Sequence, residues 1–281
     1  MARYDIPDEA WAIIQPLLPA EPASPRAGRP WAEHRKIING MFWGLCSGAP
    51  WRDLPERYGP WKTVYNRFNR WSKPGVINII FNKLLLSLDA HGLIDWSATV
   101  LDGSNIRALR CAAGAHKKHS DITRDNGLGR SCGGFGTKIH LATDGSGLPL
   151  NIVVSPGQAH ESQFAQRLLD GIGVQRQNGS MKRRGHAVLA DKAYSGHILR
   201  NELKNKDIKA VIPRESNEKM VSDGRALLDR DAYRNGNVVE RCFGRLKEYR
   251  RIATRYDKTA RNYLAMVKLG CIRLYYQRLC N

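Results

Sequence analysis

The sequence predicts an α/β protein in which a mixed β-sheet flanked by helices follows an N-terminal helical region. Apolar residues recur at helical spacing through the first hundred residues, and near residue 97 the pattern changes to short β-type runs separated by glycines. Beyond residue 149 such runs alternate with helical segments, as in β-α-β units. We therefore expect a helical domain over residues 1–96 and a sheet domain over residues 97–281.

Four helices are predicted in the first domain, over residues 8–18, 31–46, from 61 onward and 76–90. Asp8 is the expected cap of the first, and the spacing of Trp61, Val64, Phe68 and Trp71 places one apolar stripe on the third. Core packing is the better interpretation of these tryptophans than stacking on DNA bases. Gly- and Pro-rich segments separate the helices.

The second and third helices are joined by a turn-rich link. Lys62, Arg67 and Arg70 lie mostly away from the apolar stripe of the third helix. Such an arrangement is compatible with a helix-turn-helix-like DNA-binding domain whose second helix enters the major groove. A helical bundle whose basic side chains are merely solvated fits the pattern equally well.

In the second domain the predicted element order is β-β-β-α-β-α-β-α. Three strands come first, SATVLDGSNIRA, TKIHLAT and LPLNIVVS, and DGSG is the hairpin turn between the last two. HAVLAD and KAVIP then alternate with helices, the second capped by Ser195, and a final helical stretch runs from Tyr233 to Leu279 with one break near residues 256–258. Crossover connections make these later strands parallel, so the sheet is mixed. Residues 111–136 have no packing period, which predicts a long loop.

The charge of the chain indicates a polyanionic partner. Lys and Arg number 45 against 26 Asp and Glu, a formal charge of +19, and the C-terminal third is the most basic. Cationic side chains release counterions condensed on nucleic acid, so we expect DNA or RNA as the partner. No run is long and apolar enough for a membrane span, and six scattered cysteines form no C-x-x-C pair. We expect a soluble, cytoplasmic protein that has no membrane partner.

Three carboxylates stand out by position. Asp102 ends the first predicted strand, Asp191 ends the fourth, and Glu240 lies in a helix rich in cations. Strand ends and a packed helix can bring such side chains together, where mutual repulsion favours divalent cations between them. Mg²⁺ suits an all-oxygen site, and two ions can activate an attacking hydroxyl and stabilise the leaving oxygen. Any one of these residues taken alone fits a turn or cap role better.

Several long motifs resemble the DDE transposases of bacterial insertion sequences, in particular the insertion-sequence-five-like family. They are GTKIHLATDGSG, SPGQAHE, HAVLADKAYS, VIPRES and NVVERCFGRLKEYRRIATRYDKTARNYLA, with GAPWRDLPERYGPWKTVYNRFNRW in the N-terminal region. The resemblance implies a ribonuclease-H-like catalytic domain with Asp102, Asp191 and Glu240 as the metal-binding triad. It also implies two Mg²⁺ ions, with Mn²⁺ as a substitute.

The resemblance further implies binding of terminal inverted repeats, cleavage at the element ends and joining of the freed 3′-hydroxyls to target DNA. Joining two ends needs two active sites, which indicates a homodimer on double-stranded DNA at the bacterial nucleoid. The related signature Y-(2)-R-(3)-E-(6)-K fits Tyr233, Glu240 and Lys247, but Gly236 holds the Arg position and Arg234 is the nearest substitute. Two alternatives stay open: a catalytically impaired DNA-binding regulator of its own element, and a nuclease without strand transfer.

Further DNA contacts are predicted around the triad. Lys192 and Tyr194 follow Asp191 as candidate phosphate and base-stacking contacts. A basic run beyond Glu240 has few opposing carboxylates, which favours contact with a DNA backbone. Its members are Arg241, Arg245, Lys247, Arg250, Arg251 and Arg255. A zinc site from Cys111, His116, His119, Cys132 and His140 matches no standard spacing.

Overall fold

A mixed β-sheet forms the centre of the fold, and its main path runs β2-β3-β1-β7-β8, with β4 pairing β3 and β9 pairing β1. The computed structural model describes residues 3–20, 31–73, 75–113, 126–175, 179–182, 185–214 and 228–280. The strands are β1 (Ala98–Ala108), β2 (Gly129–Ser131), β3 (Gly134–Asp144), β4 (Pro149–Pro156), β7 (Ala187–Leu189), β8 (Lys209–Val211) and β9 (Thr254–Arg255). A separate small hairpin joins β5 (Val174–Gln175) to β6 (Met181–Lys182).

The pairing confirms the predicted meander followed by parallel strands. β1 pairs with β3 and β3 with β4 in antiparallel register, whereas β7 is parallel to β1 and β8 is parallel to β7. The DGSG turn joins β3 to β4, and the Asp144 carboxylate accepts hydrogen bonds from the backbone N–H groups of Ser146 and Leu148 at 3.0 and 2.7 Å. This order agrees with the ribonuclease-H-like expectation.

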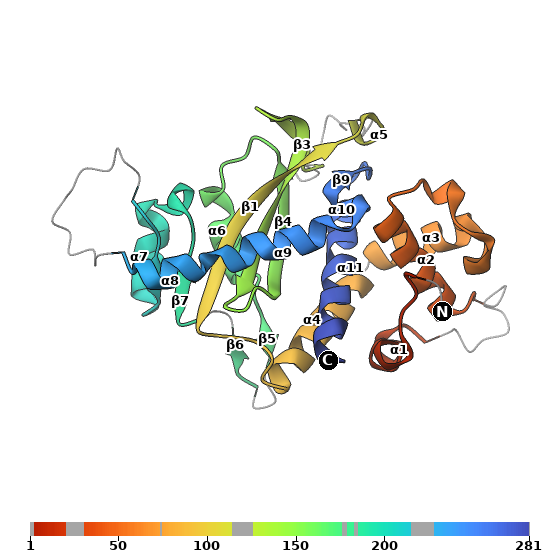
Figure 1. Cartoon of the computed structure of the whole chain (residues 1–281), viewed down its shortest axis with the longest axis horizontal. Helices are drawn as coiled ribbons and strands as arrows, with labels where there is room; N and C mark the ends of the chain where they lie inside the picture. Colours follow the sequence, from red (N-terminus) through yellow and green to blue (C-terminus); the bar gives the residue numbers. More distant parts are fainter. Residues whose placement is uncertain are drawn as a thin grey trace.

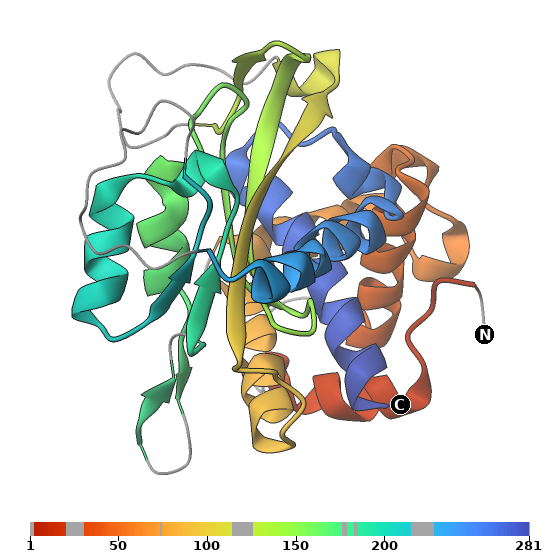
Figure 2. The same cartoon turned by 60° about the vertical axis from the view of Figure 1, so that its left-hand side comes forward.

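Helices cover both faces of the sheet (Figure 2). On one face lie α6 (Ser162–Asp170) and α7 (His197–Asn205), which connect the later strands. On the other face lie α9 (Val238–Lys247), α11 (Ala260–Leu279) and α4 (Val76–Ala90). The sheet flanked by helices is therefore as the sequence predicts.

The N-terminal helices surround the end of the chain rather than standing apart from it (Figure 1). They are α1 (Asp8–Ile14), α2 (His34–Ser47), α3 (Trp61–Ser72) and α4, close to the predicted ranges. α11 packs against all four, so one continuous core joins the helices to the sheet. Asp8 does not cap α1: Pro7 holds that position, and Asp8 pairs with Arg35 instead.

The link between α2 and α3 differs from a helix-turn-helix. It contains two short 3₁₀ turns, η3 (Trp51–Asp53) and η4 (Glu56–Tyr58), within residues 48–60. A helix-turn-helix has a turn of about 3–4 residues. The helices are confirmed, and the helix-turn-helix arrangement is not.

The C-terminal region is more broken than predicted. It comprises α8 (Arg230–Arg234), the 3₁₀ turn η6 (Asn235–Asn237), α9, α10 (Arg250–Ala253), β9 and α11. The first break after α9 comes at Tyr249, whose backbone is extended, and β9 then pairs with the end of β1. Two other predictions need correction: α5 (Arg110–Ala113), β2 and the start of β3 occupy parts of the expected loop 111–136, and α7 is preceded by Gly196 rather than capped by Ser195. Among the described helices, none combines the length and hydropathy that a membrane crossing needs.

Candidate active site

Asp102 and Asp191 lie on neighbouring parallel strands at matching positions. The pairing of β1 with β7 ends at Val100 and Leu189, and each aspartate comes two residues further along its strand direction. Because side chains alternate between faces along a strand, Asp102 shares the face of Val100. Asp191 stands just beyond β7, where its carboxylate accepts from the Ala193 N–H at 3.0 Å. Strand register therefore brings the two carboxylates to one place.

Glu240 comes to the same face on α9. The helix buries Val239, Cys242, Phe243 and Leu246 and leaves Glu240 exposed. Two turns further on, Lys247 donates to the Ser104 hydroxyl of β1 at 2.7 Å. Since Glu240 and Lys247 share one side of the helix, this contact holds that side over the part of β1 that carries Asp102.

The electrostatics connect the three carboxylates. The pKa of Asp102 is raised to about 7, with burial as the largest cause. A hydrogen bond from the Gly103 N–H lowers this pKa, and the charges of Glu161, Asp191 and Glu240 raise it. Burial is also the largest cause of the raised pKa of Asp191, followed by the charge of Glu161. A proton or a cation is needed to hold these groups together.

Glu161 is a fourth carboxylate that the sequence argument did not single out. Its carboxylate pairs with Lys138 at 3.0 Å, and both side chains are largely buried. A Cβ on Gly103 would lie 2.7 Å from that carboxylate, so the glycine beside Asp102 lets the Glu161 side chain take its present position. The signal was present in SPGQAHE, one of the motifs that carry the family resemblance, but no spacing argument joined it to Asp102.

The donor chemistry of this cluster suits a hard divalent cation. The three side chains offer carboxylate oxygens, and none of the ion pairs among the described residues involves Asp102, Asp191 or Glu240. Within the described part of the chain, no three Asp, Glu, His or Cys side chains stand close enough to form a ready-made metal site. Asp191 and Glu240 are exposed, so both carboxylates are accessible to an ion from solvent. The residues present therefore fit Mg²⁺.

Most of the predicted DNA contacts lie on the surface. The exposed members are Lys62, Arg70, Lys192, Tyr233, Arg234, Arg241, Arg245 and Lys247. Lys192 follows Asp191 directly, and Lys247 shares the helix side of Glu240, so these two lie nearest the carboxylates. Lys62 and Arg70 lie on α3, away from the sheet (Figure 1). The cations thus form two separate groups.

Three predicted DNA contacts are corrected by burial. Tyr194 is fully buried, and burial raises the pKa of its hydroxyl well above the usual range, so it is a core residue rather than a stacking platform. Arg67 lies between aromatic rings: its guanidinium is 4.4 Å from the Trp31 ring centre and contacts His34 Nδ1 at 3.0 Å. The sequence placed Arg67 mostly away from the apolar stripe of α3, whereas the structure buries it among aromatic rings.

Arg251 is the third correction. Its side chain pairs with Asp257 at 3.5 Å, donates to the Ala49 carbonyl at 3.0 Å and lies 4.8 Å from the Trp51 ring centre. Arg255 is likewise enclosed and donates to the carbonyls of Asp257 and Gly127. The chain leaves the helix before these residues, so the helical phase of α9 no longer turns them outward.

The described residues do not support the zinc site considered from the sequence. Cys111 and Cys132 are exposed, and His116 and His119 lie outside the described residues. His140 is fully buried, where it contacts the Ser155 hydroxyl at 2.7 Å and stacks on Phe164. Burial lowers its pKa to about 4, as for a neutral core histidine.

Comparison with known proteins places the chain in a family. A family model described as "Transposase DDE domain" matches residues 92–274, and one described as "Putative transposase of IS4/5 family" matches residues 6–81. The protein belongs to the DDE transposases of insertion sequences. No solved structure matches it.

Curated relatives each match part of the chain. It is 34% identical over 140 residues to the "Putative transposase for insertion sequence element IS6501" of Brucella ovis, which is 50% of this chain and 97% of that protein. It is 37% identical over 115 residues to an "Insertion element IS402 uncharacterized 16.2 kDa protein" of Burkholderia cepacia, 39% of this chain and 77% of the relative. A second IS402 protein, named as a transposase, is 28% identical over 145 residues, 51% of this chain and 64% of its own length.

Proposed function

We propose that this transposase binds the terminal inverted repeats of its element, cleaves DNA at the element ends and joins the freed 3′-hydroxyls to target DNA. The observation that carries the proposal is the placement of Asp102, Asp191 and Glu240 on one face of the sheet, where their charges interact and none of the ion pairs among the described residues involves them. Family membership supports the reaction class, and the formal charge of +19 supports DNA as the substrate.

In this proposal Asp102, Asp191 and Glu240 hold two Mg²⁺ ions, for which Mn²⁺ is a substitute. Bound there, the ions supply an activated water or 3′-hydroxyl and stabilise the leaving oxygen in an in-line displacement. Lys192 and Lys247 bind phosphates next to the cut. The hydrogen bond from Lys247 to Ser104 keeps the ammonium group over the strand that carries Asp102. The Lys138–Glu161 ion pair packs against Gly103 on the opposite face of β1, next to Asp102.

The division of labour along the chain follows from the two groups of cations. Residues 1–96 recognise the terminal repeat through the exposed face of α3, where Lys62 and Arg70 lie, and residues 97–281 perform the chemistry. Joining two ends requires two active sites, so the working form is a homodimer on DNA. The site of action is the bacterial nucleoid in the cytoplasm.

A second candidate function rests on Gly236. The related signature has Arg at this position, and without it a contact to phosphate near Glu240 is missing. A protein that binds the ends but cleaves them poorly acts as a regulator of its own element. The presence of all three carboxylates favours the active enzyme over this alternative.

The test is an end-cleavage and joining assay on labelled DNA that carries the flanking inverted repeats. Mg²⁺ supports nicking and joined products, and EDTA or Asp191→Asn removes both while end binding persists. Nicked DNA without joined products indicates a nuclease, and specific binding without either product indicates the regulator.

A further inference from the structure

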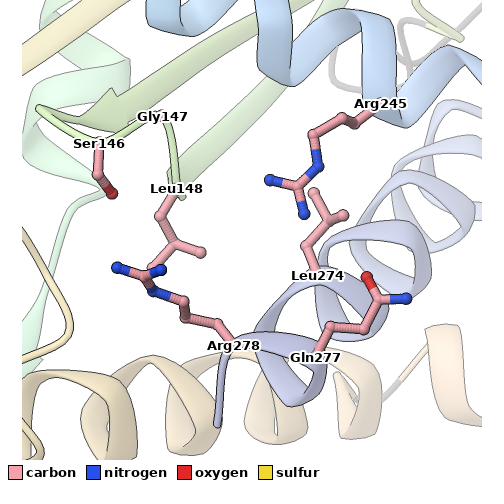
Figure 3. A pocket seen from close by; sticks show the side chains of 7 residues that line it. All are labelled: Ser146, Gly147, Leu148, Arg245, Leu274, Gln277 and Arg278. Atoms are coloured by element: carbon pink, nitrogen blue, oxygen red, sulfur yellow. The ribbon is translucent and has the colours of Figure 1, made fainter. Parts of the chain in front are cut away.

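A groove with basic walls runs along α9 on the side away from Glu240. Its wider part, of about 660 Å³, is lined by Val100 and Leu189 on the sheet, and by Arg234 and Arg241. Its narrower part, of about 190 Å³, lies between α9, the β3–β4 turn and the end of α11 (Figure 3). The two parts lie next to each other, because Gly145 lines the wide part and the next residue of the turn, Ser146, lines the narrow part. We call the two parts together the basic groove.

The basic groove is separate from the candidate active site. At about 100° per residue, Arg241 and Arg245 lie about 100° and 140° around α9 from Glu240, whereas Lys247 lies within about 20° of it. The lining of the groove includes neither Lys247 nor any of the three carboxylates. α9 therefore presents the carboxylate to one side and two arginines to another.

The walls of the narrow part are fixed by specific contacts. Asp144 accepts from the N–H groups of Ser146 and Leu148, which closes the turn. Gly147 has φ +87°, and a Cβ there would lie 2.9 Å from the Val238 carbonyl oxygen, so glycine lets the turn abut the start of α9. Tyr275 of α11 donates to the Pro149 carbonyl just after the turn. Turn, α9 and α11 thus form one rigid frame.

The charges that face the narrow part are positive. The side chains of Arg245 and Arg278 extend toward it from α9 and α11 (Figure 3), and no ion pair between described residues involves either of them. The nearest carboxylate on the turn, Asp144, is fully buried and already accepts several hydrogen bonds. Two guanidinium groups facing one space repel each other unless an anion lies between them.

The wide part has a more balanced surface but remains basic. Lys209 pairs with Asp229 at 2.6 Å and Arg234 with Asp231 at 3.5 Å, and Asp95 is the one acidic residue in its lining. Arg241 lies one helical turn from Arg245 and continues the row of cations into this part. Both parts of the groove carry cationic side chains and lie next to each other along α9, which suits successive phosphates of one chain better than a single small anion.

We propose that the basic groove binds the phosphate backbone of DNA at a place distinct from the phosphate held at the carboxylates, with Arg245 and Arg278 clamping one phosphate. The planar forks of two arginines match the oxygens of a phosphodiester. This inference rests on the proposed function for the identity of the polymer. It adds Arg278 and the β3–β4 turn, neither of which the sequence analysis predicted as a DNA contact, to the DNA-binding surface.

The test measures equilibrium binding of fluorescent duplex DNA in EDTA at several KCl concentrations. We expect the double variant Arg245→Gln, Arg278→Gln to bind about tenfold more weakly, and its plot of log affinity against log salt to be shallower by about 0.9, one phosphate contact. Lys204→Gln, an exposed charge change on α7 on the opposite face, leaves both unchanged. Arg278→Lys keeps the slope, which separates lost charge from lost structure.

A phosphate-ethylation interference experiment locates the contact. We expect one backbone position whose ethylation weakens wild-type protein but not the double variant. An unchanged salt slope in a folded double variant overturns the proposal. The proposal is also overturned if the double variant binds inorganic phosphate more weakly, as measured by calorimetry, but binds DNA as tightly as the wild type does. Binding is measured in EDTA and so does not depend on cleavage. A wild-type protein that binds DNA through the groove but does not cleave it would contradict the proposed function and still support this inference.

Discussion

Two parts of one arginine-rich stretch have opposite environments. In α9, Arg241 and Arg245 are exposed, whereas Arg251 in α10 and Arg255 in β9 are 4% and 0% exposed. In α9 the apolar residues face the sheet and the helical phase turns the cations outward. After Tyr249 the chain leaves that phase, and carbonyls and aromatic rings enclose the guanidinium groups. The arginines of one sequence run are thus exposed to solvent in α9 and buried as structural residues beyond it.

The largest effect is expected from Glu240→Gln, which tests whether the outward side of α9 carries chemistry. Loss of a metal ligand removes several kcal/mol of transition-state stabilisation, so we expect cleavage to fall by about 10³-fold or more. Binding of the ends remains. Glu248→Gln, an exposed glutamate at the end of the same helix, is the control. Equal activity of the two variants would remove Glu240 from the site.

Arg251→Gln tests the inward part of the comparison. Its partner Asp257 has 5% of its side chain exposed, and breaking such a buried pair costs about 3–5 kcal/mol. We expect that loss in the free energy of unfolding, measured by urea denaturation. Arg250→Gln, at the exposed neighbouring position, stays within about 0.5 kcal/mol. If the variant instead shows a weaker salt dependence of DNA binding and unchanged stability, Arg251 is a DNA contact and not a structural residue.

Arg241→Gln should give the reverse pattern. Its side chain is exposed, so we expect the free energy of unfolding to change by less than about 0.5 kcal/mol. The salt dependence of DNA binding decreases by about 0.9, the value for one lost phosphate contact. Anisotropy titrations at several salt concentrations measure it. If stability falls and the salt slope does not, the contrast between the two parts is wrong.

The smallest effect is expected from Gly236→Arg. No atom lies within 4 Å of a Cβ built at this position, so a side chain can start here without a clash at its Cβ. A new charged contact to phosphate is worth about 1 kcal/mol, or about fivefold in affinity for the element end. Gly236→Gln fills the same space without charge and serves as the control. A gain of equal size in both variants would indicate a helix effect instead of a phosphate contact.

The sequence predicted the framework of this fold because the pattern was local. The DGSG turn, the apolar stripe of α3 and the alternation of strands with helices each specify an element without reference to distant residues. The register of β1 and β7 could not be derived this way, but ending each strand near an aspartate was enough to bring Asp102 and Asp191 together.

What the sequence could not supply were contacts between distant segments. Glu161 lies beside Asp102 where Gly103 leaves space for its carboxylate. Arg251 is buried by Trp51 and Ala49, about two hundred residues earlier, and Arg67 by Trp31 and His34. Charge alone favours solvent for all such residues, and only tertiary packing shows where rings and carbonyls replace water.

The central claim is that Asp102, Asp191 and Glu240 bind metal as one site, and iron-directed cleavage of the protein tests it most directly. With added hydrogen peroxide and ascorbate, Fe²⁺ bound in place of Mg²⁺ reduces the peroxide to hydroxide and a hydroxyl radical, and ascorbate returns the Fe³⁺ to Fe²⁺. The radicals cut the backbone beside the bound ion, and mass spectrometry maps the cuts. We predict cuts near residues 102, 191 and 240 that excess Mg²⁺ suppresses and that Asp102→Asn abolishes at all three places. Cuts confined to one of these places, or unaffected by Mg²⁺ and by the substitution, would contradict a shared metal site.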